Sequence, residues 1–322
     1  MSELKKIPLL VVCGPTASGK SSLAVELAKL YNGEVISADS MQIYSEFSVI
    51  TARTTEAQMQ GVPHWLMGFL SPSESFSVAE YAVLAREKIA DIYSRGRLPI
   101  MCGGTGLYIS SVVNNVLFDD NGADVKRRRE LEEYARLNGR HALWERLNTL
   151  DPESAENIHE NNVVRVVRAI EVCERMGMPF SQVKKLNMRE ESPYESLILK
   201  IDFRDRDELY RRIDERVDEM LENGMVEEAQ RIFESEYSAT ACQAIGYKEL
   251  IPYLKGEAEL DECVEIIKKE TRHYAKRQLT WFRRMENAVT IYAENENDKK
   301  IFFENVQKAI AKSKILCYNR KE

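Results

Sequence analysis

A seven-residue apolar run, IPLLVVC from Ile7 to Cys13, is followed at once by GPTASGKS from Gly14 to Ser21. The run has the length of a buried strand, and helical spacing of apolar residues follows from Lys20 to Leu30. The octapeptide fits the pattern G-x-x-x-x-G-K-[ST] without mismatch, and it lies between a strand and a helix, where a phosphate-binding loop must lie. We therefore predict an α/β fold with a P-loop NTPase-like core.

The residue types of this loop define its chemistry. Its glycines let successive backbone amides point into one concavity, and the N-terminus of the following helix adds positive potential. Lys20 can neutralise phosphate oxygens, and Ser21 can bind Mg²⁺ through its hydroxyl. A diphosphate ester would suit the loop as well as a nucleoside triphosphate. The residues expected to bind phosphate are Gly14, Pro15, Thr16, Ala17, Ser18, Gly19, Lys20 and Ser21.

The first third of the chain continues to alternate between strand and helix. Strands are expected at residues 34–38 and 98–102, with an amphipathic helix at 78–94 between them. Strand character returns at 197–203, and one or two long helices are expected at 206–234. This alternation is typical of a parallel sheet flanked by helices.

The middle of the chain has a different character. Residues 119–176 are strongly charged, with helical spacing and few strand signals. Asn162 could cap a helix from Val163 to Met176, and Gly177 could end it. The predicted domains are a P-loop catalytic core at 1–117 and 200–322 and an all-helical insertion domain at 118–199.

Composition and charge restrict the class of protein. The longest apolar run is far shorter than the roughly 20 residues that a membrane span needs, and no secretory cleavage pattern follows it. The cysteines form no C-x-x-C pair, which argues against a disulfide framework or a zinc site. The net charge of −7 argues against general coating of nucleic acids. We expect a cytoplasmic monomer that binds no membrane.

Possible ligand groups follow two of the predicted strands. Asp39 could accept a proton from an attacking nucleophile, or it could cap a helix that starts near Met41 or bind a magnesium water. The glycines from Gly103 to Gly106 could bring the backbone close to a ligand, or could only form a tight turn. The apolar segment at 61–66 could shape an organic pocket or form a core strand.

Basic residues gather in two segments. Residues 268–284 contain seven basic residues and one acid, with three aromatic residues between them, and Lys126 to Arg129 form a second cluster. Cations and aromatic rings suit RNA, which offers phosphates and unstacked bases. Either cluster alone could be a solvated helix face. Two such clusters in a chain of negative net charge favour a localised surface that binds RNA.

Further motifs follow the phosphate loop in a fixed order. They are ISADSMQIY (Ile36–Tyr44), VPH (Val62–His64), FSVA (Phe76–Ala79), GGTGLYI (Gly103–Ile109), DP (Asp151–Pro152), IHEN (Ile158–Asn161), RVVRAIEV (Arg165–Val172), LYRRI (Leu209–Ile213), AIGYKE (Ala244–Glu249) and TRHYAKRQLTW (Thr271–Trp281). Over roughly residues 8 to 284, the chain thus resembles the tRNA dimethylallyltransferase family of the bacterial type.

The resemblance implies a reaction and a set of roles. A dimethylallyl group would pass from dimethylallyl diphosphate to the N6 amine of the adenine 3′ to the anticodon, with Mg²⁺ as cofactor and the diphosphate held by the phosphate loop. Asp39 resembles the base that takes the proton, and Thr16 the hydroxyl that contacts the bridging oxygen. Arg212 and Arg216 lie in the diphosphate-binding segment. Of the two, Arg216 is expected to stabilise the leaving diphosphate, unless each arginine only pairs with a glutamate of its own helix.

The family reaches its adenine by flipping it into a channel that the prenyl donor enters from the other end. A base must leave its stack before its amine can be alkylated. By resemblance or by their basic character, the positions expected to contact the tRNA anticodon stem-loop are Asp39, Ser40, Met41, Gln42, Thr105, Arg128, Val163, Val164, Arg165, Val166, Val167, Arg168, Lys276 and Arg277. The chain departs from the family pattern at Ile50 to Thr54, where relatives have Gly-Thr-Ala-Lys-Pro, and at Trp65 and Gln243.

Three other functions share parts of this pattern. A P-loop small-molecule kinase would use the same loop and an acid after the second strand, but predicts a shorter chain with an arginine-bearing lid. An adenylate isopentenyltransferase would share the core and act on a free nucleotide. A nucleotide-dependent RNA-binding switch would need no base at Asp39. The helical insertion and the basic C-terminal segment favour a tRNA acceptor.

Overall fold

The computed structural model describes residues 6–116, 124–187, 191–235, 237–238, 240–293, 299–313 and 315. The chain divides into two compact units. The first unit consists of Met1–Val113 and Ser192–Glu322, and the second is Asn114–Glu191. None of the described helices combines the length and the apolarity needed to cross a membrane.

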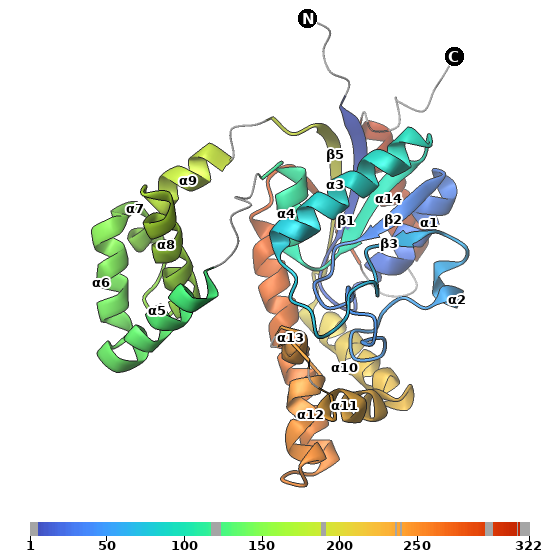
Figure 1. Cartoon of the computed structure of the whole chain (residues 1–322). Helices are drawn as coiled ribbons and strands as arrows, with labels where there is room; N and C mark the ends of the chain where they lie inside the picture. Colours follow the sequence, from blue (N-terminus) through green and yellow to red (C-terminus); the bar gives the residue numbers. More distant parts are fainter. Residues whose placement is uncertain are drawn as a thin grey trace, which may run out of the picture. The chain divides into compact units, whose positions relative to one another are not determined.

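A parallel sheet of six strands forms the centre of the first unit, in the order β3-β2-β4-β1-β5-β6 (Figure 1). The central strand β1 lies between β4 and β5, which explains its nearly continuous apolar sequence. The predicted parallel sheet is confirmed. The strands are β1 (Ile7–Cys13), β2 (Gly33–Ser37), β3 (His64–Trp65), β4 (Leu98–Gly103), β5 (Tyr194–Asp202) and β6 (Ala288–Tyr292).

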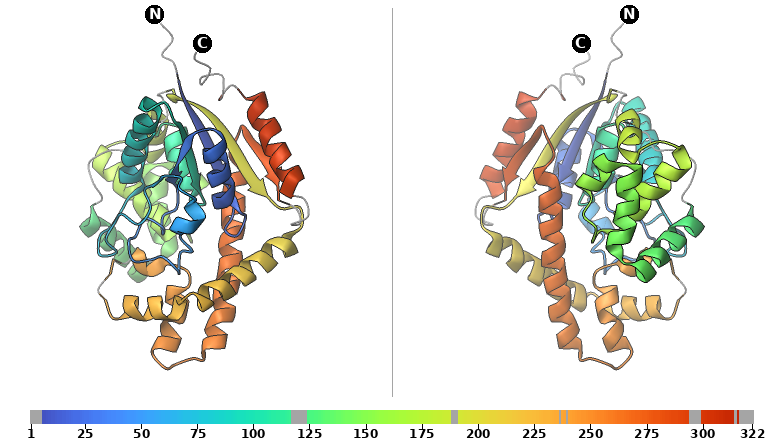
Figure 2. Two further views of the ribbon diagram at one scale, coloured as in Figure 1. Left: turned by 90° about the vertical axis from the view of Figure 1, so that its right-hand side faces the viewer. Right: turned by 90° about the vertical axis from the view of Figure 1, so that its left-hand side faces the viewer.

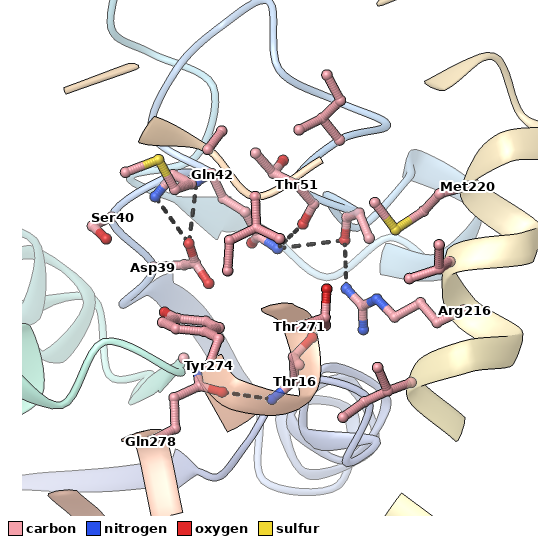
Figure 3. A pocket seen from close by; sticks show the side chains of 18 of the residues that line it. Thr16, Asp39, Ser40, Gln42, Thr51, Arg216, Met220, Thr271, Tyr274 and Gln278 are labelled. Carbon is pink, nitrogen blue, oxygen red and sulfur yellow. Dashed lines mark hydrogen bonds between the residues drawn. The ribbon is translucent and has the colours of Figure 1, made fainter. Parts of the chain in front are cut away.

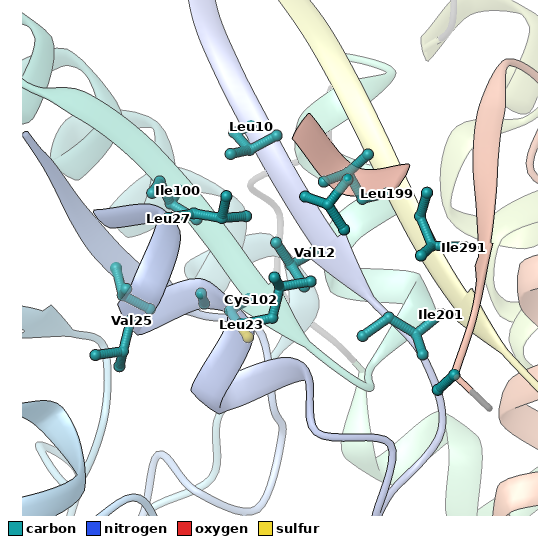
Figure 4. Close-up of a cluster of buried hydrophobic side chains, with 14 of the residues drawn as sticks. Leu10, Val12, Leu23, Val25, Leu27, Ile100, Cys102, Leu199, Ile201 and Ile291 are labelled. Atoms are coloured by element: carbon teal, nitrogen blue, oxygen red, sulfur yellow. The ribbon is translucent and has the colours of Figure 1, made fainter. Parts of the chain in front are cut away.

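Helices flank this sheet (Figure 2). Leu10 and Val12 of β1 pack in one apolar cluster with Leu27 of α1 (Lys20–Leu30) and Ile310 of α14 (Lys299–Lys312) (Figure 4). Leu9 and its alternate neighbours along β1 point away from that cluster, because successive strand residues face opposite sides. The helix α3 (Val78–Ser94) packs on β1, β2 and β4, and α4 (Gly106–Val113) packs against α3.

A group of helices lies between β5 and β6 in the sequence. It comprises α10 (Arg206–Glu222), α11 (Met225–Phe233), α12 (Tyr247–Leu254) and α13 (Leu260–Arg283), with a 3-10 turn at Ala241–Gln243. α13 packs against both α10 and α12. The segment predicted at 206–234 forms two helices, because Gly224 adopts a left-handed backbone (φ 93°) between them. The short helix α2 (Glu56–Met59) precedes β3.

The second unit is all-helical in its described part. Its apolar core brings together Leu131, Leu143, Leu147 and Ile170. The helices are α5 (Val125–Asn138), α6 (Arg140–Leu150), α7 (Pro152–Asn157), α8 (Val163–Met176) and α9 (Phe180–Asn187). The predicted bounds of α8 are confirmed, since the Asn162 side chain accepts the Arg165 amide and Gly177 ends the helix with a φ of 64°.

The predicted end of the insertion at residue 199 is too late. β5 begins at Tyr194, and its register with β1 starts at the pair Ile7 and Tyr194. The polar residues Glu195 and Ser196 hid the start of this strand, whose apolar signal begins at Leu197. The core therefore resumes at Ser192. The other predicted boundary, between 117 and 118, falls on residues 117–123, which lie outside the described residues.

Candidate functional site

One cavity of about 250 Å³ lies where β1, β2 and β4 end (Figure 3). The loop after β1 contributes Thr16, Lys20 and Ser21, the loop after β2 contributes Asp39, and β4 contributes Cys102. Ligands of open α/β sheets bind at this carboxyl edge. Two helices form a further part of the wall, with Ile213, Arg216, Val217 and Met220 from α10 and Ile267, Thr271, Tyr274, Arg277 and Gln278 from α13.

The phosphate loop presents cationic and polar groups that anions would satisfy. The Lys20 ammonium donates a hydrogen bond to the carbonyl of Pro15 at 3.1 Å. Burial, followed by the nearby Arg216, lowers the pKa of Lys20, while Asp39 acts in the opposite direction. Within the described part of the chain, the buried Ser18 hydroxyl has no hydrogen-bond partner. A bound diphosphate would offset the repulsion between the two cations.

Asp39 has one restrained and one available carboxylate oxygen. Its Oδ1 accepts the backbone amides of Met41 at 2.9 Å and Gln42 at 3.3 Å. Among the residues that the structure describes, no group donates to Oδ2. The capping interaction proposed as an alternative therefore exists, on a turn rather than on a helix. It uses a single oxygen, so the cap and a general base are compatible roles for Asp39.

Thr105 fixes the residue beside Asp39. Its Oγ1 accepts the backbone amide of Ser40 at 2.9 Å, and its own amide donates to the carbonyl of Ala38 at 3.0 Å. The loop after β4 thereby holds the loop after β2. Thr105 itself is not among the residues that line the cavity.

The glycines of the GGTG segment approach the protein's own chain closely. A Cβ added at Gly103 would lie 2.1 Å from the Ala38 carbonyl oxygen, and one at Gly106 would lie 2.1 Å from Trp281 Cδ1. Neither a ligand alone nor a tight turn alone therefore explains them. These positions must be glycine because a neighbouring loop and α13 pack against this backbone.

Gln278 on α13 joins two loops of the site, and sequence reasoning missed it. Its Oε1 accepts the Thr16 amide at 2.9 Å, and its Nε2 donates to the carbonyl of Gly104 at 3.1 Å. A Cβ at Gly104 would lie 2.2 Å from that nitrogen. A lone glutamine among seven cations gave no signal, because its partners lie more than 170 residues away in the sequence.

Tyr274 is a second residue whose role sequence reasoning missed. In the sequence it is one of three aromatic residues among the cations of 268–284, whereas in the structure it lines the cavity near Asp39 (Figure 3). Burial, and then the charge of Asp39, raise the pKa of Tyr274. The phenol therefore stays protonated and can donate a hydrogen bond.

The two candidate arginines of α10 differ in their environment. Arg212 Nε donates to Glu208 Oε1 at 2.6 Å, so the pairing considered as the alternative is present for Arg212. Arg216 lines the cavity, and its Nη2 donates to the carbonyl of Ala52 at 3.2 Å. Burial is the main cause that lowers the pKa of Arg216, with Asp39 and Glu219 opposing it. Arg216 therefore lines the cavity that contains Asp39, whereas Arg212 lines the second cavity only, and the preferred role of Arg216 stays a prediction.

A second cavity adjoins the first. Its volume is about 660 Å³, and both cavities share Lys20, Ser21, Ala52, Arg216 and Met220 as lining residues. Ala17, Ser18, Gly19 and Arg212 line the second cavity only. Because the phosphate loop borders both, a ligand whose phosphates lie on the loop can be reached from two directions.

Comparisons with known proteins identify the family of this chain. The sequence pattern of the IPP transferase family matches residues 42–285. A tRNA dimethylallyltransferase of Thermoanaerobacter sp. (strain X514) is 46% identical over 308 residues, which cover 95% of this chain and 98% of that relative.

The chain belongs to the IPP transferase family.

Solved structures agree with this membership. A full-length tRNA isopentenylpyrophosphate transferase from Bacillus halodurans has a TM-score of 0.68 and 40% identity, covering 96% of this chain and 99% of the other. A eukaryotic dimethylallyltransferase, described as acting on tRNA, has a TM-score of 0.81 and 30% identity, with 97% and 80% covered. The expected membership of the tRNA dimethylallyltransferase family, and the expectation that this chain is a prenyl transferase enzyme, are confirmed.

Some basic residues of the segment at 268–284 are engaged in ion pairs. On α13, Lys268 pairs with Asp218 at 2.7 Å and Arg272 with Asp214 at 2.5 Å, both on α10. Lys276 and Arg277 remain exposed, and Arg277 also lines the first cavity together with Ser40, Met41 and Gln42. The basic segment thus has one side that packs on α10 and another that is available to RNA.

In the second unit, a buried carboxylate organises two of the expected tRNA contacts. Glu171 is 2% exposed, and its Oε2 accepts Arg128 Nε and Arg168 Nη1, each at 2.8 Å. Its Oε1 accepts the backbone amide of Asp124 at 2.9 Å. Both arginines stay partly exposed, so they can still approach phosphates.

The α8 residues expected to contact tRNA divide by burial. Val166 and Val167 are 0% and 2% exposed and lie in the core of the second unit, so their side chains do not face solvent in this structure. Their place on the helical face toward the core explains this. Val164 is 73% exposed, Arg165 is exposed, and Val163 packs partly on the core.

The family departures have structural explanations. Arg53 Nη1 donates to the carbonyls of Tyr44 and Ser45, so this cation shapes its own loop. Trp65 Nε1 donates to Glu34 Oε2 at 2.7 Å. The segment at 61–66 contributes the edge strand β3 and does not line the first cavity, which favours the strand alternative. Gln243 lines that cavity.

Proposed function

We propose that this IPP transferase transfers a dimethylallyl group from dimethylallyl diphosphate to the N6 amine of the adenine 3′ to the anticodon of tRNA, releasing diphosphate. One observation carries the proposal: a phosphate loop, an available carboxylate oxygen on Asp39 and the half-buried Arg216 line one cavity whose remaining wall is largely apolar. Relatives that match nearly the whole chain are named tRNA dimethylallyltransferases.

The chemistry requires a base on one side of the cavity and cations on the other. The adenine N6 forms a bond to C1 of the donor while the bond from C1 to the diphosphate oxygen breaks. Asp39 Oδ2 accepts the proton from N6. Lys20 and Arg216 stabilise the negative charge of the leaving diphosphate, and the Thr16 hydroxyl contacts its bridging oxygen. Fixed donors act most strongly where charge develops.

Mg²⁺ fits the donor set on the diphosphate side. Ser21 borders both cavities and can supply one protein oxygen. Within the described residues, no three His, Cys, Asp or Glu side chains form a metal-binding group. This suits Mg²⁺, which keeps several waters and binds mainly through substrate phosphates. When bound, the ion would neutralise charge on the diphosphate.

The two adjoining cavities support entry of the two substrates from different sides. Arg212 and the outer residues of the phosphate loop line the second cavity, which suits the charged donor. Met41, Gln42 and Arg277 line the first cavity, which suits an unstacked adenine. We further propose that the protein acts in the cytoplasm as a monomer and that Arg128, Arg165 and Arg168 contact tRNA phosphates.

The proposal is tested by prenyl transfer with competing acceptors. Radiolabelled dimethylallyl diphosphate and Mg²⁺ are incubated with an anticodon stem-loop, with AMP and with ATP. We expect label on the stem-loop. Label on a free nucleotide would indicate an adenylate isopentenyltransferase, and absence of transfer to every acceptor would contradict the proposal.

A further inference from the structure

Glu228 of α11 is a buried carboxylate without a cationic partner in the described part of the chain. It is 1% exposed. Its Oε2 accepts the Ser48 amide at 3.1 Å, the Ser48 hydroxyl at 2.8 Å and the Val49 amide at 2.9 Å. Its Oε1 accepts the Val49 amide at 3.1 Å and the Ile50 amide at 2.8 Å. Three consecutive backbone amides therefore take the place of a counter-ion and offset the cost of burying the carboxylate.

The segment held by Glu228 reaches the cavity within a few residues. Ile50, Thr51 and Ala52 line the first cavity. The Ala52 amide donates to the Val49 carbonyl at 2.8 Å, so the turn closes directly on a residue that Glu228 holds. Ala52 has a φ of 43°, a left-handed backbone that an alanine adopts only where its surroundings impose it.

The carbonyl of this strained residue is a hydrogen-bond acceptor for Arg216. Arg216 Nη2 lies 3.2 Å from the Ala52 oxygen, and Figure 3 shows the guanidinium extending from α10 toward this segment. No acidic side chain lies within ion-pair distance of Arg216 in the described residues. A neutral carbonyl therefore orients the guanidinium, and its other donors remain available to a diphosphate.

We propose that Glu228 is a positioning residue for Arg216, acting through the backbone of residues 48–52. It touches neither substrate. By fixing three amides it sets where the Ala52 carbonyl lies, and that carbonyl sets where the Arg216 guanidinium points. The role of Arg216 belongs to the proposed function, on which this inference rests. Misplacement of a catalytic group by about 1 Å can cost about 100-fold in rate.

Glu228→Gln tests this role because the side chain keeps its shape and gains a nitrogen that faces backbone donors. We expect kcat in the prenyl-transfer assay to fall about 10- to 100-fold, with KM for the stem-loop unchanged. In an Arg216→Ala background, adding Glu228→Gln should lower kcat by less than about 3-fold, because the effects of two residues that act through one another are not additive. Glu227→Gln, an exposed neighbour on α11, is the matched control and should retain wild-type kcat.

A merely structural role gives a different pattern. It predicts a loss of stability without a change in kcat per folded molecule, or equal losses in the wild-type and Arg216→Ala backgrounds, and either result would overturn the proposal. If Glu228→Gln does not fold, Ser48→Ala removes a single donor to the carboxylate and should lower kcat about 3-fold in the same Arg216-dependent manner. An unchanged kcat for Ser48→Ala would then contradict the positioning role of Glu228.

Binding of inorganic diphosphate separates this inference from the proposed function. Arg216 is expected to hold the diphosphate whatever its organic group, so Glu228→Gln should weaken binding of Mg²⁺ and diphosphate in calorimetry about 10-fold. A wild-type protein that binds diphosphate in a Glu228-dependent way but transfers no prenyl group would contradict the proposed function alone. Equal diphosphate affinity in both proteins, with normal transfer by the wild type, would contradict the positioning role alone.

Discussion

At the scale of single residues, Asp39 is distinguished by the unequal use of its two oxygens. Two backbone amides restrain Oδ1, and no described group donates to Oδ2. Asparagine can keep the restraint through its own oxygen while placing an amide nitrogen where the base was. The Asx turn should therefore survive the substitution that removes the base.

Asp39→Asn should lower the single-turnover rate of prenyl transfer by about 10²- to 10⁴-fold, the usual contribution of a general base. The affinity for the stem-loop should stay within about 2-fold of wild type, because little surface changes. Both quantities are measured on the same preparation, by rapid quench and by filter binding. A loss of affinity as large as the loss of rate would show that Asp39 serves binding and not proton transfer.

We expect the affinity for diphosphate to depend on pH through the protonation of Lys20. Burial and Arg216 lower the pKa of Lys20 in the donor-free protein, and a bound anion favours the charged amine and raises that pKa again. Below the lowered pKa the amine is charged in both states. As the pH rises through it, binding must take up a proton, so diphosphate affinity should fall.

Calorimetry in two buffers of different ionisation enthalpy counts the protons taken up on diphosphate binding. The wild type should show extra uptake at alkaline pH compared with Lys20→Arg, whose guanidinium stays charged throughout. Identical proton counts in the two proteins would exclude Lys20 as the linked group.

At the scale of secondary-structure elements, the edge of the sheet depends on a buried carboxylate that pairs with two partly exposed arginines. The Glu34 side chain of β2 is 1% exposed and pairs with Arg95 and Arg97. Hydrogen bonding from Arg95 is the largest cause that lowers the pKa of Glu34, to about 2, against the opposing effect of burial. Trp65 of β3 donates to the same carboxylate, so this family departure ties β3 to the sheet.

Glu34→Gln should lower the free energy of unfolding by about 2 kcal/mol at neutral pH, after allowance for the partly exposed arginines. Because the folded pKa is depressed, this stability is present above the unfolded value near 4.5 and is lost as the pH falls toward about 2. Urea unfolding at pH 6 and pH 3.5 should therefore give a smaller difference between the two proteins at the lower pH. Glu26→Gln, at an exposed site on α1, should have the same free energy of unfolding as the wild type at both pH values.

The cations of helix α13 lie in two different environments. Lys268 and Arg272 pair with acids of α10, whereas Arg277 is exposed beside the cavity. Arg277→Glu should weaken stem-loop binding and reduce the slope of log affinity against log salt by about 1, while leaving donor affinity nearly unchanged.

Lys268→Gln provides the comparison, since its cation is already paired within the protein, and it should leave the salt slope unchanged. Fluorescence anisotropy across a series of salt concentrations measures both variants. An effect of Arg277→Glu on the donor alone would place this residue in the diphosphate site instead.

The sequence predicted the elements with strong local patterns. β1, α1, α3 and α8 were predicted with the bounds observed, because their apolar period, caps and glycine stops are local properties. The start of β5 was predicted three residues too late because Glu195 and Ser196, near its beginning, are polar. β6 was not predicted at all. Val289 and Tyr292 of β6 are exposed and Ile291 is buried, so β6 has no regular alternation, and only pairing with β5 defines it.

At the scale of the whole molecule, the candidate site consists of residues that are contiguous in the sequence and of residues whose partners lie far away in it. The phosphate loop and Asp39 could be found because their chemistry lies in contiguous residues. Gln278, Tyr274 and Glu228 could not, because each acquires its role from partners far away in the sequence. The burial of Val166 and Val167 likewise depends on how the helices of the second unit pack.

The first unit brings the phosphate loop, Asp39 and α13 around one cavity, where we propose that an exocyclic amine attacks a prenyl diphosphate. The most direct measurement compares two anticodon stem-loops that differ only in the 6-amino group of the purine 3′ to the anticodon. With labelled dimethylallyl diphosphate and Mg²⁺, we expect label on the stem-loop that carries adenine and none on the one whose purine lacks the amine. Label on both stem-loops, or on neither, would contradict it.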